Sequence, residues 1–361
     1  MTTMAIDNKD KKVLNVPHLR FPEFSGEWEN TELQYIAPNI CSGKDKPTSN
    51  GTVALYGSTG IIGMTRLASY NEEIVLVARV GANAGQLQIT TIPCGVTDNT
   101  LIINAKEWNR YIYYYLQHYN LNRLVFGSGQ PLITGSMLKK LKIIYGEESE
   151  RNKIVNLLCL LDERIATQNK IIEDLKKLKS AISERLFKSV KGSTVLLSDL
   201  CDIVKGKQIN GENLSDSGNY YVMNGGTEPS GYYDNYNVEA STISISEGGN
   251  SCGYVQFNTS PFWSGGHCYS IQNIADKVDN MYLYHYLKSN EDAIMKLRIG
   301  SGLPNIQKKD LAMFKIIVPK IEWQIKISTF LSSLERKAEI EERIQNVMQK
   351  QKLYLLQQMF I

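Results

Sequence analysis

The chain has 361 residues, which is too long for one compact domain and fits two or three. Its 40 lysines and arginines against 37 aspartates and glutamates give a formal net charge of +3, which excludes a polycation and an acidic disordered chain. Any surface for nucleic acid must therefore be a local patch, and the 42% of apolar residues suffices for folded cores.

The N-terminus and the cysteines bear on the cellular compartment. The first residues, MTTMAIDNKDKK, hold no apolar segment of signal-peptide length, and no window in the chain approaches the uninterrupted apolar run of a membrane span. The six cysteines include no CxxC pair, which is typical of reduced thiols rather than of a disulfide framework or a zinc site. We expect a soluble, cytoplasmic protein with no membrane partner.

Short β-rich runs mark two stretches of the chain. They stand among Gly, Asn and Ser turns, which favours α+β modules with irregular loops. Each stretch continues into an aromatic helix and then a Gly-Ser-Gly-x-Pro turn. The clearest strands are 74–80, 100–104, 241–246 and 268–272, and the aromatic helices are 111–119 and 281–289.

A long amphipathic helix follows each module. From Ile154, alternating steps of four and three residues meet apolar side chains at eight of ten positions, and the same steps from Ile327 do so at seven of ten. This spacing predicts two helices with coiled-coil seams, which we expect to pair antiparallel within the chain. The predicted seam residues are Ile154, Leu158, Leu161, Ile165, Ile172, Leu175, Ile182 and Leu186 in the first helix, and Ile327, Leu331, Leu334, Met348, Leu355 and Met359 in the second.

The modules and helices form an internal repeat. Shifting the sequence by 173 places residues 127–187 on 300–360 without a gap, with 17 identities in 61 positions. The first copy departs from the second in having Gly146 where the second has Pro319, and this difference predicts a looser start to its long helix. The predicted segments are 1–148 for a tail and the first module, 149–190 for the first helix, 191–321 for the second module, and 322–361 for the second helix.

Catalytic motifs are lacking. The glycines of YGSTGIIG are not followed by GK[ST] of a Walker loop, and SPFW at 260–263 has Phe262 where the S-P-P-Y methyltransferase motif has proline. The four histidines show no ligand spacing for a metal; His118 and His285 lie in the aromatic helices, where packed or half-exposed imidazoles are expected. These absences favour a binding protein that is not itself an enzyme.

The order of module, long helix, module and long helix resembles the specificity subunit of type I restriction-modification systems. The resemblance covers nearly the whole chain. It includes the lead-in VPHLRFPEFSGEW at 16–28, the GSGxPxI turns at 127–133 and 300–306, and the helix entry IIVPKIEWQIKI at 316–327. It implies an α+β fold with two β-rich target-recognition domains in a pseudo-twofold repeat, separated by two long helices that form an antiparallel coiled coil.

The resemblance also implies a function. Each target-recognition domain would read one half of a bipartite asymmetric site in double-stranded DNA, while the helices set the spacing and dock two methylation subunits. S-adenosylmethionine would belong to the methylation subunits, and ATP and magnesium to the partner subunits, including a restriction subunit that translocates and cleaves DNA; this chain would hold no metal or cofactor. Two alternatives stay open: a repeat coiled-coil scaffold that does not act on DNA, and a self-sufficient DNA methyltransferase.

Candidate DNA-binding residues come from glycine-flanked loops. Lysines suit phosphates, and Arg and Asn suit the edges of guanine and adenine. The candidates are Lys44, Lys46, Ser58, Thr59, Arg79 and Asn83 in the first module, and Lys205, Lys207, Gln208, Asn224, Thr227, Glu247 and Asn250 in the second.

One aligned position differs in charge between the modules. Arg79 of the first corresponds to Glu247 of the second. Arg donates to guanine and Glu accepts from cytosine N4, so the two modules could read different bases there. The alternative is that both residues form ion pairs inside their modules. Ser128 and Ser301 are interpreted as turn or helix-cap residues.

Overall fold

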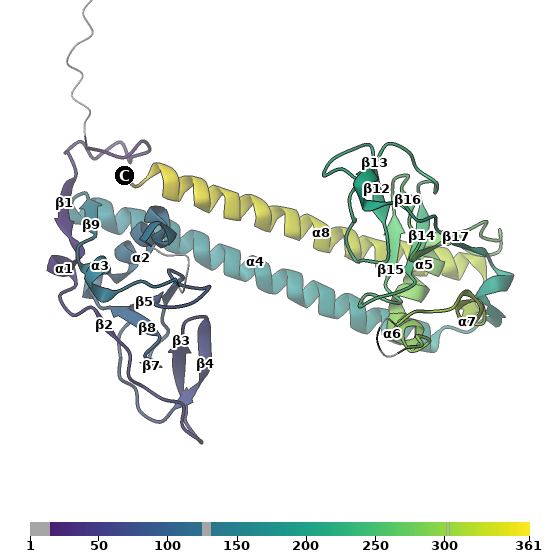
Figure 1. The fold of residues 1–361 in the computed structure, drawn as a ribbon, viewed down its shortest axis with the longest axis horizontal. Helices are drawn as coiled ribbons and strands as arrows, with labels where there is room; N and C mark the ends of the chain where they lie inside the picture. Colours follow the sequence, from purple (N-terminus) through teal and green to yellow (C-terminus); the bar gives the residue numbers. More distant parts are fainter. Residues whose placement is uncertain (1–14, 125–130, 301, 303) are drawn as a thin grey trace, which may run out of the picture. The chain divides into compact units, whose positions relative to one another are not determined.

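The computed structural model describes residues 15–124, 131–300, 302 and 304–361, so the predicted turn residues Ser128 and Ser301 lie outside the described residues. The chain divides into two compact units (Figure 1). Unit 1 comprises residues 1–168 and 344–361, and unit 2 comprises residues 169–343. The helices α4 (Glu148–Ser189) and α8 (Ile321–Gln358) each run through both units.

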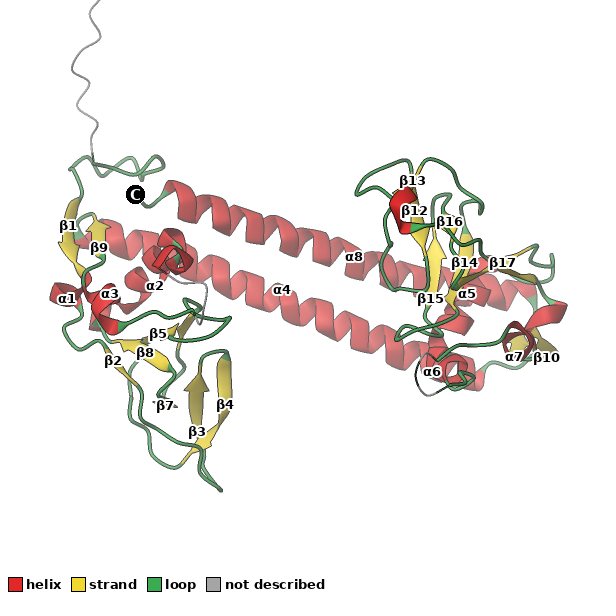
Figure 2. Ribbon diagram, viewed as in Figure 1, coloured by secondary structure: helices red, strands yellow, loops and turns green. Residues whose placement is uncertain are grey.

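Unit 1 is built on two small sheets (Figure 2). The first is antiparallel, in the order β2-β8-β5-β6, and the second has the order β4-β3-β7 with β3 and β7 parallel. A further pair, β1 with β9, lies beside the helices. The elements are β1 (Glu29–Glu32), α1 (Leu33–Ile36), β2 (Cys41–Ser42), β3 (Val53–Gly57), β4 (Gly60–Thr65), β5 (Val75–Ala78), β6 (Leu87–Ile89), β7 (Cys94–Val96), β8 (Thr100–Ile103), α2 (Asn109–Tyr119), α3 (Gly135–Lys139) and β9 (Lys142–Tyr145).

Unit 2 repeats this topology. Its sheets have the orders β11-β17-β14-β15 and β13-β12-β16, β12 and β16 are parallel, and β10 pairs with β18. The predicted repeat of two α+β modules is therefore confirmed. The elements are β10 (Ser193–Leu196), β11 (Asp202–Lys205), β12 (Tyr220–Met223), β13 (Tyr232–Tyr233), β14 (Thr242–Ser246), β15 (Val255–Asn258), β16 (Trp263–Ser264), β17 (Cys268–Gln272), α5 (Asn280–Ser289), α6 (Glu291–Met295), α7 (Lys308–Ala312) and β18 (Lys315–Val318).

The aromatic helices α2 and α5 join each sheet to the long helices. In unit 1, the ring of Phe360 at the end of the chain lies 5.5 Å from Tyr111 and 6.0 Å from Tyr115 of α2. In unit 2, Phe187 near the end of α4 lies 5.8 Å from Tyr282 and 5.2 Å from Tyr286 of α5. Each core is therefore completed by a phenylalanine that lies in, or just after, the long helix that begins in the other unit.

Ion pairs fix the direction of the two long helices. In unit 2, Lys179 Nζ lies 2.6 Å from Glu335 Oε1. In unit 1, Lys352 Nζ lies 2.6 Å from Asp162 Oδ1, and these two residues occupy the repeat-equivalent positions. Within unit 2, Lys176 Nζ also lies 2.5 Å from Glu342 Oε1, so the residue number on α8 falls as that on α4 rises. The two helices therefore run antiparallel in unit 2, as predicted.

The predicted seam residues lie on the face of each long helix that is least exposed to solvent. All ten positions counted from Ile154 and all ten from Ile327 are buried or half-buried. Ile154 and Leu158 pack in the core of unit 1, and Ile327 and Leu331 pack in that of unit 2. The start of each helix thus belongs to the domain that precedes it in the chain.

The expectation of a loose start to α4 is wrong. Glu150 is fully buried there and accepts two hydrogen bonds from Arg20, at 2.7 and 2.8 Å, and one from Trp28 Nε1 at 3.0 Å. A Cβ at Gly146 would stand 2.2 Å from Glu150 Oε2 and 2.7 Å from Trp28 Nε1, so a side chain there would displace the groups of this hydrogen bond. At the corresponding start of α8, buried Gln324 donates to the carbonyls of Lys277 and Pro319.

The aromatic helices also place the two histidines noted in the sequence. His285 is 2% exposed, its Nε2 lies 2.9 Å from Ser332 Oγ, and burial lowers its pKa to about 4. His118 is half-buried against Phe360, and burial lowers its pKa as well. All six cysteines are unpaired. Over the described ranges, no helix has both the length and the apolar character that a bilayer crossing requires.

The seam can be tested with two leucines of α4. Leu158 is fully buried and Leu160 is 64% exposed, so both substitutions to alanine change the same chemistry in one helix. We expect Leu158→Ala to lower the free energy of unfolding by about 2–5 kcal/mol, because it leaves a cavity, and Leu160→Ala to change it by less than about 0.5 kcal/mol. Denaturant unfolding measures both, and equal losses would contradict the seam assignment.

Candidate nucleic-acid interface

Four loops of unit 2 meet at one edge of its sheets. They follow β11, β12 and β14 and precede β17, and backbone hydrogen bonds tie them together. Gly206 N donates to Cys268 O, Gly265 N donates to Met223 O, and Glu247 N donates to His267 O, at 2.8 to 2.9 Å. The predicted residues Gln208, Asn224 and Glu247 belong to these loops, and Lys205 is the last residue of β11.

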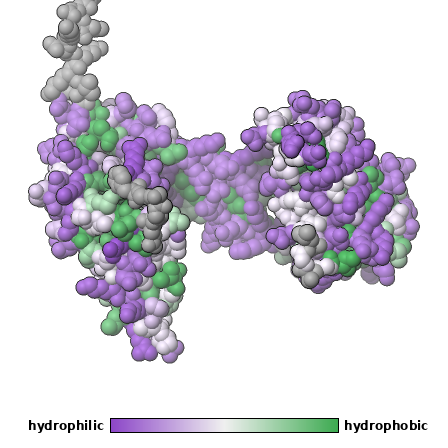
Figure 3. All heavy atoms as spheres, in the orientation of Figure 1, coloured by the Kyte–Doolittle hydropathy of each residue, from purple (hydrophilic) through white to green (hydrophobic). Residues whose placement is uncertain are grey.

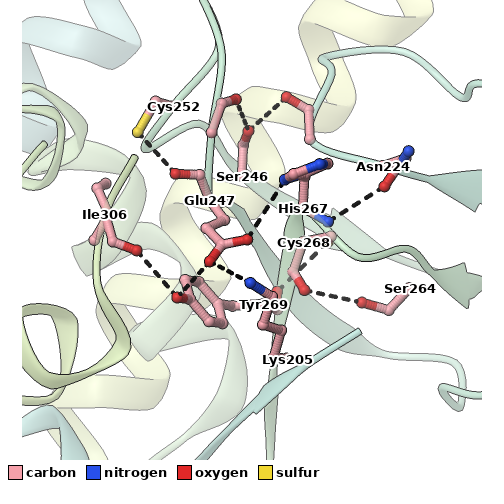
Figure 4. A network of polar contacts seen from close by, with 12 residues as sticks. Lys205, Asn224, Ser246, Glu247, Cys252, Ser264, His267, Cys268, Tyr269 and Ile306 are labelled. Atoms are coloured by element: carbon pink, nitrogen blue, oxygen red, sulfur yellow. Dashed lines mark hydrogen bonds and ion pairs between the residues drawn. The ribbon is translucent and has the colours of Figure 1, made fainter. Parts of the chain in front are cut away.

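Glu247 is the buried centre of this cluster (Figure 4). Its Oε1 lies 2.6 Å from Lys205 Nζ and 3.1 Å from Tyr269 Oη. Burial, and then the charge of Glu247, raise the pKa of Tyr269, so its hydroxyl remains a hydrogen-bond donor. The Glu247 side chain is only 8% exposed. The structure therefore favours the ion-pair alternative for Glu247 over direct contact with cytosine.

Glycines allow these loops to pack closely. A Cβ at Gly206 would stand 2.2 Å from the carbonyl oxygen of Gly265, and one at Gly265 would stand 2.5 Å from Asn224 Oδ1. Gly249 differs, because its φ of +74° demands glycine although the space around it is open. The loops are therefore held by contact with one another.

Unit 1 repeats the arrangement with different side chains. Arg79 N donates to Asn99 O, Thr97 N donates to Tyr56 O, and a Cβ at Gly43 would stand 2.2 Å from Val96 O. These contacts match those of Glu247, Gly265 and Gly206 in unit 2. The aligned pair Arg79 and Glu247 thus occupies equivalent backbone positions after β5 and β14.

Arg79 has no carboxylate partner within the described residues. Its Nη1 lies 3.4 Å from Ser42 Oγ, and its Nε is buried without a hydrogen-bond partner there. Ser58 Oγ donates to Asn99 O at 3.2 Å, which places Ser58 beside Arg79 across Asn99. This half-buried guanidinium has spare donors for an acceptor from outside the chain.

The other predicted residues differ in how they are held. Lys44 and Lys46 are exposed on either side of Asp45, whose carboxylate accepts from Val96 N at 2.7 Å and so fixes that loop. Lys207 is exposed, and its backbone N donates to Ser264 O. The exposed residues Thr59, Asn83, Thr227 and Asn250 lie on neighbouring turns, outside the two clusters around Arg79 and Glu247.

Two polar residues at the interface were not predicted from the sequence. Asn99 precedes β8 and His267 precedes β17, and each accepts a backbone hydrogen bond at its carbonyl from the residue after the central strand. The doublet Gly265-Gly266 before His267 is the signal that could have found the second one, because it repeats the glycine doublets at 225–226 and 248–249. No group of three or more potential metal-ligating side chains occurs among the residues whose positions are described.

The chain matches the family of type I restriction modification DNA specificity domains twice, over residues 12–177 and 191–350. The chain belongs to this family. The two matches fall on the two copies of the internal repeat, so each unit contains the greater part of one DNA specificity domain. A scaffold unrelated to DNA and a self-sufficient methyltransferase are not favoured by this membership.

Curated relatives are named as specificity subunits. A putative type I specificity subunit from Mycoplasma genitalium is 34% identical over 122 residues, which are 33% of this chain and 31% of the relative. One from Mycoplasma pneumoniae is 32% identical over 145 residues, or 40% of this chain and 38% of the relative. The aligned segments thus span about a third of the length of these two relatives.

A solved structure shares the fold along the whole chain. The crystal structure of a type I restriction-modification S subunit from M. genitalium matches with a TM-score of 0.73 and 19% identity, covering 96% of this chain and 99% of that one. At this identity the likeness concerns the fold alone. It agrees with two specificity domains that share a pair of long helices.

The close packing of the unit 2 loops can be tested at two glycines. A Cβ at Gly206 would collide with backbone oxygens, whereas one at Gly211 would meet nothing within 4 Å. We expect Gly206→Ala to destabilise the protein by about 1–3 kcal/mol, as overpacking does, and Gly211→Ala to have a much smaller effect. Thermal unfolding of both variants measures the difference. A wild-type melting temperature for Gly206→Ala would refute the close contact between the loops at Gly206 and Gly265.

Proposed function

We propose that this chain is the DNA sequence-recognition subunit of a type I restriction-modification complex and that it is not itself catalytic. Each specificity domain reads one half of a bipartite, asymmetric site in double-stranded DNA. The observation that carries this proposal is the pair of equivalent loop clusters, which share backbone hydrogen bonds but carry Arg79 in one domain and a Lys205–Glu247 pair in the other. A common frame with different side chains suits two different half-sites.

The long helices are proposed to set the distance between the half-sites. α4 has 42 residues, which at about 1.5 Å each make a rod of about 63 Å, longer than the roughly 34 Å of one turn of B-DNA. Continuous helices without proline or glycine resist bending. The spacer between the half-sites would therefore be of fixed length.

The outer faces of the helices are proposed to dock two methylation subunits. Several exposed apolar side chains stand one position before a seam residue on both helices, and in an antiparallel pair such positions lie on one side. Exposed apolar patches are typical of interfaces. Figure 3 shows the surface of one face of the protein as mostly hydrophilic, with apolar residues in small groups. The residues are Leu160, Ile344, Val347 and Tyr354 in unit 1, and Ile171, Leu178, Phe330 and Ile340 in unit 2.

The chemistry in this proposal belongs to the partners. S-adenosylmethionine binds to the methylation subunits, and ATP and magnesium serve the partner subunits, including the restriction subunit that translocates and cleaves DNA. Within the complex this chain supplies the choice of sequence.

Methylome sequencing of a host that expresses the chain with its methylation subunits tests the proposal. We expect one bipartite motif. Arg79→Ala and Asn83→Ala should relax only its first half and Asn224→Ala only its second, since one good base contact is worth about 1–3 kcal/mol. The unaltered half-site serves as the internal reference. Absence of any motif that depends on this chain would refute the proposed function, and an unchanged motif in all three variants would remove these residues from base recognition.

The exposed lysines should act on affinity and not on sequence choice. Lys44→Ala and Lys207→Ala are expected to weaken binding to specific and unrelated duplexes by similar factors and to reduce the slope of log K against log salt by about one. Lys177→Ala is the control, because Lys177 is 75% exposed on α4 beside Glu173. Wild-type salt dependence in the Lys44 and Lys207 variants would contradict a phosphate role.

A further inference from the structure

His267 stands where the loops of unit 2 meet, and its backbone is fixed from both sides. Its N donates to Asn224 Oδ1 at 3.2 Å, and its carbonyl accepts from Glu247 N at 2.9 Å. The side chain is nevertheless 62% exposed. A residue with a rigid backbone and an exposed side chain is suited to contact a ligand at low entropic cost.

The imidazole has a buried carboxylate oxygen beside it. His267 Nδ1 lies 3.7 Å from Glu247 Oε2, an ion-pair distance longer than a hydrogen bond. Oε2 is covered from solvent and has no hydrogen-bond partner within the described residues, although Oε1 of the same carboxylate is paired with Lys205 and Tyr269. An unsatisfied buried acceptor is costly, so a short movement that brings the Nδ1 proton to Oε2 is favourable.

We propose that His267 is a specificity-determining residue of the second domain, which contacts one base pair through Nε2, and that Glu247 is its positioning residue. This inference rests on the proposed function. With the proton on Nδ1 facing the carboxylate, Nε2 is left as an acceptor. Nε2 then accepts from an exocyclic amino group, N6 of adenine or N4 of cytosine, at the major-groove edge.

The first domain supplies the matched comparison. Asn99 occupies the position equivalent to His267, since its carbonyl accepts from Arg79 N at 3.0 Å. Its neighbour in the cluster is Arg79, so no carboxylate lies at that backbone position to orient an imidazole. The substitution His267→Asn thus places in the second domain the residue that the first domain uses, in a loop geometry that already accommodates it.

The test is methylome sequencing of the complex with His267→Asn and His267→Ala. We expect one position of the second half-site to lose or change its base preference, by about fivefold to a hundredfold, while the first half-site is unchanged. An unchanged second half-site in both variants would overturn the proposal, and so would a uniform loss of methylation with an intact motif, because that is the signature of a phosphate contact.

A binding measurement on synthetic duplexes tests the chemical group. Replacing the base at the affected position by an analogue without the exocyclic amino group should weaken binding of the wild-type complex about as much as His267→Ala does. It should cost the His267→Ala complex nothing further, because the contact is already lost. Additive losses would show that Nε2 does not meet that amino group and would overturn the assignment.

Glu247→Gln tests the positioning role. It should relax the same base position as His267→Asn, and the double variant should be no more relaxed than His267→Asn alone. Glu322→Gln, at an exposed position of α8, is the control. A Glu247→Gln complex that melts earlier but keeps the wild-type motif would leave Glu247 only structural and refute this part. If the wild-type chain directs methylation to no motif, the proposed function fails. If the wild-type motif is found and the His267 substitutions leave it unchanged, this inference alone fails.

Discussion

Each domain of this protein depends on a core that its own segment cannot complete. The aromatic helix of each unit packs against the start of one long helix and a phenylalanine at the end of the other, Phe360 on Tyr111 in unit 1 and Phe187 on Tyr282 in unit 2. Burying such large apolar side chains stabilises each core by about 1.5–3 kcal/mol apiece. The end of each long helix packs in the core that is formed at the start of the other helix. This arrangement requires an antiparallel pair, and the apolar seams and the two equivalent ion pairs fit it.

This construction separates what is held constant from what varies. The backbone hydrogen bonds around the central strands, the close glycine contacts and the tyrosine-to-carbonyl bonds of α2 and α5 recur in both units. The side chains that project from the same frame differ, with Arg79 and Asn99 in one domain and Glu247 and His267 in the other. In the proposed function, the choice of DNA sequence can therefore diverge while the fold is kept, since these loop residues lie outside the aromatic cores of the two units.

The sequence predicts the scaffold better than the interface, for a physical reason. Helical seams and a gapless repeat are periodic patterns, so Ile154 and Leu331 could be assigned to packed positions from spacing alone. The ion pair of Glu247 with Lys205 and that of buried Glu150 with Arg20 join residues 42 and 130 positions apart, and no local pattern encodes such contacts. His267 belongs to no sequence motif. Its position beside Glu247 and Asn224 is set by contacts between loops that are far apart in the sequence.

The core of unit 1 requires the end of α8 and the residues that follow it, and removal of this segment measures the requirement. A chain truncated after Arg343 lacks Leu356, Met359 and Phe360, which belong to the core of unit 1, and keeps every residue of unit 2. Hydrogen exchange followed segment by segment measures the outcome. We expect β5 and α2 to lose their protection while β14 and α5 keep theirs. Full protection of β5 and α2 in the truncated chain would contradict this requirement.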